Sequence, residues 1–170
     1  MSLARVRALI FLGVLILLAA GIVTWTITHD NQNQVKAVGR ECSKGEVRAN
    51  LTIPKEQDVK LNVYNSTDRS GLAVSTATKL EGYKFQVLKK ANLSVVVHSS
   101  AEIRFGPKEV GAAQLVLAYV PGAEKVFDIN RTDATVDLVL GDKFSGLRTP
   151  TDVKEAQIEL GEPKAPSGTC

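Results

Sequence analysis

Residues 59–80 read VKLNVYNSTDRSGLAVSTATKL, and this stretch decides the fold. Three apolar residues at its start alternate with polar ones, namely Val59, Leu61 and Val63. This alternation predicts a strand with one buried face. Residues 65–71 are turn-forming types. Beyond them, apolar or small residues recur at helical spacing: Leu72, Ala73, Thr76, Ala77 and Leu80. The stretch therefore predicts a strand, a turn and a helix of about three turns that ends near Gly82.

The same two periodicities recur further along the chain. They predict strands at residues 85–87, 103–105, 125–129 and 135–140, and a second helix from Pro107 to about Val120. Val95-Val96-Val97 in the intervening segment favours a strand of its own or an extension of the following one. The element order is β-α-β-β-α-β-β. With right-handed crossovers, it predicts an α+β sandwich of ferredoxin-like character, in which two helices cover one face of a mixed sheet.

A long apolar segment precedes this pattern. Residues 8–28 carry no charged side chain, and roughly 20 apolar residues span a bilayer core as a helix. The segment is longer than a signal-peptide core and no clear cleavage site follows, so it predicts a retained single-pass transmembrane anchor. Charge alone does not orient it, because Lys and Arg occur on both sides. The short amino-terminal tail favours an N-in anchor in the plasma membrane, with the domain on the extracytoplasmic side.

These patterns divide the chain into five parts. We expect a cytoplasmic tail at 1–7, the transmembrane anchor at 8–28, an extracytoplasmic stalk at 29–58, a domain at 59–147 and a mobile C-terminal tail at 148–170. The tail is assigned because it shows no core pattern.

The two cysteines lie at the ends of the part outside the membrane. Cys42 and Cys170 match no metal-binding spacing, and an even count in an exported domain is compatible with one disulfide. Because Cys170 is the last residue and chain ends fray, a free or intermolecular thiol is the other reading. The sequence leaves both open.

Several short motifs occur in a fixed order between the first strand and the last. They are Val63-Tyr64-Asn65-Ser66-Thr67, Gly71-Leu72-Ala73, Ile103-Arg104-Phe105-Gly106-Pro107, Ala112-Ala113, Pro121-Gly122-Ala123 and Val136-Asp137-Leu138-Val139-Leu140-Gly141-Asp142 with Phe144. Together they resemble the LytR C-terminal domain family over about residues 59–147. Ser66 and Lys108 stand where that family commonly has glycine.

The resemblance implies a small membrane-anchored actinobacterial envelope protein. In this family the domain follows either a LytR-CpsA-Psr phosphotransferase domain or only a membrane anchor. The expected function is a non-enzymatic binding module that holds cell-wall material or wall-assembly proteins and maintains envelope integrity. The expected partner is peptidoglycan or an attached phosphate-bearing glycan. The alternative is a scaffold, without a ligand of its own, that docks on a LytR-CpsA-Psr phosphotransferase.

The residues themselves offer little for catalysis. The net charge is +3, two units of which come from Arg5 and Arg7, so the remainder gives no electrostatic case for nucleic-acid binding. His29 and His98 are the only histidines, and no nucleophile elbow or calcium loop is present. We therefore expect no enzyme activity, no cofactor and no metal.

Two loops form the first candidate site, for an anion of wall material. If the first and third strands are parallel neighbours, both loops lie at one sheet edge and lead into helix amino termini, which attract anions. The candidate residues are Asn65, Ser66, Thr67, Arg69, Arg104, Gly106 and Lys108. The alternative is that Asn65, Ser66 and Thr67 only cap a helix and shape a turn.

The second candidate surface is the sheet face away from the helices. Strand alternation places polar side chains there: Lys60, Asn62, Gln86, Glu102, Arg104 and Asp137. Such a face suits a glycan or a partner, although antiparallel sheets are also commonly solvated on one side.

Overall fold

The computed structural model describes residues 42–170 and, before them, residues 7, 13, 16, 18 and 19. The predicted cytoplasmic tail, the predicted anchor and the first part of the stalk lie largely outside these described residues. Among the described residues, no helix is both long and apolar enough to cross a membrane.

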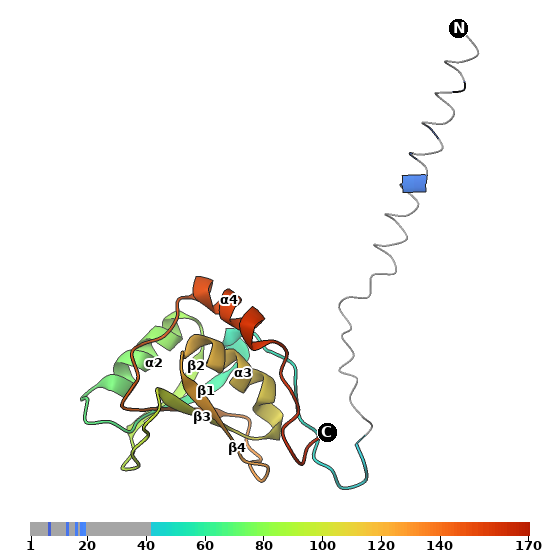
Figure 1. Cartoon of the computed structure of the whole chain (residues 1–170). Coiled ribbons are helices and arrows are strands. Elements are labelled where there is room, and N and C mark those ends of the chain that lie inside the picture. Colours follow the sequence, from blue (N-terminus) through green and yellow to red (C-terminus); the bar gives the residue numbers. More distant parts are fainter. Residues whose placement is uncertain (1–6, 8–12, 14–15, 17, 20–41) are drawn as a thin grey trace. The chain divides into compact units, whose positions relative to one another are not determined.

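Residues 42–170 form five strands and three α-helices (Figure 1). In chain order the elements are η1 (Glu56–Asp58), β1 (Lys60–Asn65), α2 (Leu72–Gly82), β2 (Gln86–Asn92), β3 (Ala101–Phe105), η2 (Pro107–Glu109), α3 (Val110–Tyr119), β4 (Ala123–Phe127), β5 (Val136–Leu140) and α4 (Pro150–Leu160). The predicted order of strands and of the first two helices is confirmed. The segment 93–100 is a loop, not a strand.

The strands form one mixed sheet in the order β2-β1-β5-β3-β4. β1 is parallel to β2 and β3 is parallel to β4, each pair joined through a helix, so the fold contains two β-α-β units. β5 lies between the units, parallel to β1 and antiparallel to β3. Both α2 and α3 cover the same face of this sheet (Figure 1).

The expected ferredoxin-like pairing is wrong. In that arrangement the first and third strands are parallel neighbours, whereas here β5 separates them and they run in opposite directions. The reason is that the two strands of each β-α-β unit pair directly with each other. The last strand, β5, then pairs with one edge of each unit and so joins the two units.

A single apolar core lies between the sheet and the helices. Alternate residues of the central strands point into it and are fully buried, among them Leu61, Val63, Ile103, Leu138 and Leu140. α2 contributes mainly Ala77 and Leu80. α3 differs, because every residue from Val110 to Tyr119 except Leu117 is buried. Its outward side therefore must also be covered.

Helix α4 supplies part of that cover. It packs on α3 and buries Val153 and Ala156. Thr149 begins it with a capping box, in which the Thr149 hydroxyl and the Asp152 carboxylate each accept from the other's backbone N–H. The prediction of a C-terminal tail without core contacts is wrong. The sequence shows no core pattern there because this short helix buries only one narrow side.

Residues 42–58, which we call the strap, supply the rest of the cover over the outward side of α3. The N–H of Asn50 donates to the carbonyl of Pro107 at 2.8 Å, and the N–H of Gly111 donates to the carbonyl of Asn50 at 3.0 Å. The Tyr119 hydroxyl donates to Glu56 at 2.9 Å; burial, and then this bond, raise the pKa of Tyr119. Residues 42–58, which the sequence analysis placed in the stalk, therefore pack as part of the domain.

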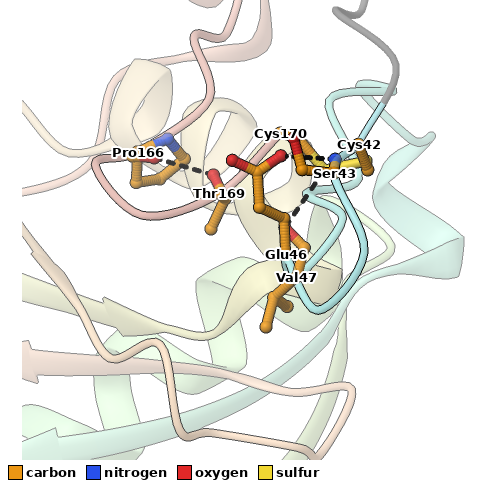
Figure 2. The surroundings of a disulfide bond; sticks show 7 residues. All are labelled: Cys42, Ser43, Glu46, Val47, Pro166, Thr169 and Cys170. Atoms are coloured by element: carbon orange, nitrogen blue, oxygen red, sulfur yellow. Dashed lines mark hydrogen bonds between the residues drawn. A yellow bond between two sulfur atoms is a disulfide. The ribbon is translucent and has the colours of Figure 1, made fainter.

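A disulfide closes the strap. Cys42 and Cys170 are bonded across 128 residues of sequence, as Figure 2 shows. The backbone pairs beside the bond, since the Cys170 N–H donates to Val47 at 3.1 Å and the Ala49 N–H donates to Cys170 at 2.9 Å. In the described part of the chain both cysteines are thus bonded to each other, and the chain end is held against the strap.

Candidate functional site

The loop after β1 uses its polar groups within itself. The Asn65 side chain accepts from the N–H and hydroxyl of Thr67 at 3.1 and 2.8 Å, and donates to the carbonyl of Arg69 at 2.8 Å. The Arg69 guanidinium donates to the carbonyls of Phe144 and Gly141 at 2.9 and 3.3 Å. These residues hold the loop and fasten the segment that follows β5.

The polar groups of Ser66 also bond within the protein, and the start of α2 has no side-chain cap. Both the N–H and the hydroxyl of Ser66 donate to the carbonyl of Leu140, at 3.0 and 2.8 Å. The residue that precedes α2 is Gly71, in a left-handed conformation at φ 72° and without a side-chain cap. Asn65, Ser66 and Thr67 therefore shape the turn but do not cap the helix.

The loop after β3 is closely packed against another loop. The Lys108 ammonium donates to the carbonyl of Thr132 at 2.7 Å, and the Arg104 guanidinium donates twice to Glu102, at 2.9 and 2.7 Å. A Cβ on Gly106 would lie 2.6 Å from the carbonyl oxygen of Arg131. Each cation in this loop thus already has a partner.

The two loops do not lie at one edge of the sheet, so the premise of a shared anion site, that the first and third strands are parallel neighbours, is wrong. Asn65, at the end of β1, pairs with Leu140, and Leu140 pairs with Ala101 at the start of β3. Gly106 follows the opposite end of β3. Burial, and then the charge of Asp133, raise the pKa of Glu109 beside that loop, against the opposing charges of Lys60, Arg131 and Lys108.

The second predicted surface is present, and we call it the open face. It is the side of the sheet away from α2 and α3, and alternation with buried residues places on it Lys60, Asn62, Tyr64, Gln86, Lys89, Glu102, Arg104 and Asp137. All six predicted residues are among these. The sequence reasoning missed Tyr64 and Lys89, although the same alternation predicts Tyr64.

A polar network crosses the middle of the open face. The Asn62 amide donates to one oxygen of Asp137 at 2.7 Å, and Arg131 donates to the other at 2.9 Å. Arg131 also donates to Asp133 and to the hydroxyl of Thr135. Burial disfavours its charge, but the carboxylates of Asp137 and Asp133 outweigh this and raise the pKa of Arg131. Arg131 lies in a loop, where no periodicity marks it.

One edge of the open face is basic and aromatic. The Lys89 ammonium lies 5.6 Å from the centre of the Tyr64 ring, within range of a cation–π contact. Lys60 and Lys89 are exposed. An aromatic ring beside amide, carboxylate and ammonium groups can stack on a sugar ring and bond to its hydroxyls.

Replacing Asp133 with asparagine is expected to make stability less dependent on acid pH. Hydrogen bonds from Thr135, followed by those from Arg131, lower the pKa of Asp133 below its usual 3.8. A lowered pKa stabilises the folded state above the unfolded pKa, and the effect is lost as pH falls through the folded pKa. Asp133→Asn should therefore cost about 1 kcal/mol at pH 7, a value limited by solvent exposure, and nothing near pH 2.

Urea unfolding at several pH values checks this expectation. Asp68→Asn is the matched control, because Asp68 is an exposed loop carboxylate with no side-chain partner among residues 42–170. An equal loss in both variants, or a loss for Asp133→Asn that persists at pH 2, would contradict the role given to Arg131 and Thr135.

Among the described residues, no group of three or more His, Cys, Asp or Glu side chains could hold a metal ion. His98 lies 3.0 Å from Asp142, and both side chains are largely solvent-exposed.

Known proteins resemble this chain in sequence and fold. The family model described as LytR cell envelope-related transcriptional attenuator matches residues 58–144. Among solved structures, the crystal structure of the soluble domain of a conserved hypothetical secreted protein, an Rv2700 ortholog from Mycobacterium marinum, is 26% identical. That likeness covers 76% of this chain and 92% of the other, with a TM-score of 0.54. No curated protein sequence matches the chain.

Proposed function

Because this chain belongs to the LytR C-terminal domain family, whose match covers residues 58–144, we propose that it is a membrane-anchored envelope protein with a non-enzymatic, outward-facing binding domain. The domain holds cell-wall material and so helps to maintain the integrity of the envelope. The family is one of cell-envelope proteins, and the similar solved structure is the soluble domain of a secreted protein.

The proposed location has three supports. The uncharged residues 8–28 act as a single-pass anchor in the plasma membrane, with residues 1–7 in the cytoplasm. A Cys42–Cys170 disulfide suits an oxidising compartment, because cytoplasmic thiols are kept reduced. The similar solved structure is the soluble domain of a protein described as secreted, which supports a domain outside the cytoplasm.

The open face is the observation that carries the binding role. The opposite face of the sheet is covered by α2 and α3, and α3 is in turn covered by α4 and the strap. The open face instead presents polar side chains to solvent along β1 and β2, although Val139 on the same side is buried. Its central charges are paired with one another, as in Arg131 with Asp137, which suits a fixed polar surface better than proton transfer. Peptidoglycan, or a phosphate-bearing glycan attached to it, offers hydroxyl, amide and anionic groups that such a surface recognises.

A sedimentation assay with purified wall sacculi tests this proposal. Residues 29–170, oxidised, are mixed with sacculi that carry or lack the attached polymers. We expect retention by at least one of these preparations. The double variant Lys60→Glu/Lys89→Glu should be retained about fivefold less, equivalent to roughly 1 kcal/mol. The matched control is Lys154→Glu/Lys164→Glu, a charge reversal of two exposed lysines that lie outside the sheet.

The outcomes are distinct. Equal losses in the two double variants would show unspecific electrostatic attraction and remove the open face from the proposal. No retention by either preparation would overturn wall binding. Crosslinking in membranes that instead captured a LytR-CpsA-Psr phosphotransferase would establish the scaffold function in its place.

A further inference from the structure

A shallow groove lies between α2 and the segment that follows β5. It has a volume of about 120 Å³. One side is a stripe along α2 and the loop before it, and the other is residues 144–147. The groove is on the helix side of the molecule, so it is separate from the open face.

The groove is lined by cations and by no carboxylate. Arg69 and Lys79 are its charged residues. Arg69 is held in place by its bonds to Phe144 and Gly141. Lys79 has no ion-pair partner anywhere in the described part of the chain. The groove therefore carries two positive charges, and one of them, the Arg69 guanidinium, is held in place by hydrogen bonds.

An unpartnered hydroxyl, that of Thr76, also lines the groove. Thr76 is 3% exposed and lines the groove, yet its hydroxyl has no hydrogen-bond partner within residues 42–170. Its neighbours on α2 differ, because Ser75 and Thr78 donate to backbone carbonyls at 3.0 Å. The Thr76 hydroxyl is therefore free to bond to a group that enters the groove.

Backbone donors on the other side are also unused. Ser145, Gly146 and Leu147 line the groove, and none of their N–H groups donates a hydrogen bond to another described residue. Phe144 and Arg148, which flank them, do donate, to Gly141 and Tyr119. Within residues 144–148, the N–H groups without a partner are thus those of residues 145–147.

We propose that this groove binds one phosphoryl group. Two cations, one unpartnered hydroxyl and adjacent free N–H groups are the donors that a tetrahedral oxyanion with several acceptor atoms satisfies, and the volume suits one such group. The shared chemistry fits a phosphate ester of a polymer as well as a lipid headgroup. The inference does not rest on wall binding through the open face.

Titration with inorganic phosphate tests the site. Amide NMR spectra of residues 29–170 are recorded at constant ionic strength, with acetate as a parallel titrant, since exposed charges are screened by salt. We expect saturable shifts centred on Ser145, Gly146, Leu147 and Lys79, with phosphate binding tighter than acetate. sn-Glycerol 3-phosphate and vesicles containing phosphatidylglycerol then compete for the site, and the better competitor identifies the source of the group.

Three variants make the result decisive. Lys79→Gln should weaken phosphate binding about tenfold by removing a charge-assisted bond. Thr76→Val, which keeps the shape of the side chain, should weaken it severalfold without lowering the Tm, because the lost hydroxyl has no partner in the free protein. Lys154→Gln is the matched control on α4 and should leave binding unchanged.

Four results would overturn the proposal. They are shifts that do not saturate, shifts scattered away from the groove, an equal loss in the Lys79 and Lys154 variants, and normal phosphate binding by the Thr76→Val protein. If the chain sediments with sacculi but fails these tests, the proposed function stands and this inference alone fails.

Discussion

The double variant Cys42→Ser/Cys170→Ser is expected to lose about 4 kcal/mol of unfolding free energy, the largest effect of any change considered. The disulfide spans 128 residues, and in the chain-entropy account a loop of about that length restricts the unfolded chain by roughly this amount. For a domain of this size the Tm should fall by about 10–15 °C. Urea unfolding of residues 29–170 measures the difference.

Reduction provides an independent control. Oxidised wild type treated with a dithiol should unfold at the same urea concentration as the double variant, and the double variant should not respond to the dithiol. Serine at both positions leaves no free thiol to form dimers. A loss below about 1 kcal/mol would mean that the unfolded chain stays compact without the bond, or that the cysteines do not pair.

Gly111→Ala is expected to cost about 3 kcal/mol, at the upper end for overpacking. An added Cβ would overlap the carbonyl carbon and oxygen of Thr52 and would lie 3.0 Å from the nitrogen of Ile53. These are backbone atoms, so the strap must move as a whole. Its movement breaks the bond from the Gly111 N–H to Asn50 and the bond from Asn50 to Pro107.

Gly82→Ala is the matched control for this change. Gly82 is also helical, and a Cβ there meets nothing within 4 Å. Alanine has the better helix propensity, so this variant should be as stable as wild type or about 0.5–1 kcal/mol more stable. Thermal unfolding compares the two. If Gly111→Ala is no less stable than wild type, the strap does not pack on α3 as described.

Some features that the sequence analysis missed had local signals. Thr149 and Asp152 flank Pro150 as a capping box with proline at the first helical position, which is a helix start. Residues 110–119 contain no charged side chain, and a helix that is apolar on all sides is buried on all sides. This second signal predicts a cover for α3, although it does not name α4 and the strap as that cover.

The candidate sites also divide into those that local sequence signals predict and those that depend on the tertiary structure. Alternation along β1, β3 and β5 placed Asn62, Arg104 and Asp137 on one face, because the direction of a strand side chain depends only on its position in the strand. The two loops were misplaced because their proximity depended on strand order. Arg131 and the groove beside Lys79 were missed because each joins residues far apart in the sequence.

Taken alone, the sequence determined the β-α-β-β-α-β-β order, the buried side of each strand and the family resemblance of residues 59–147, because these depend on local periodicity and short motifs. Only the tertiary structure decided that β5 lies between the two β-α-β units, that residues 42–58 and 149–160 enclose α3, and that Cys42 meets Cys170. Strand order is set by backbone hydrogen bonds that any strand edge can form. Which edges meet therefore depends on how the whole chain buries its apolar faces.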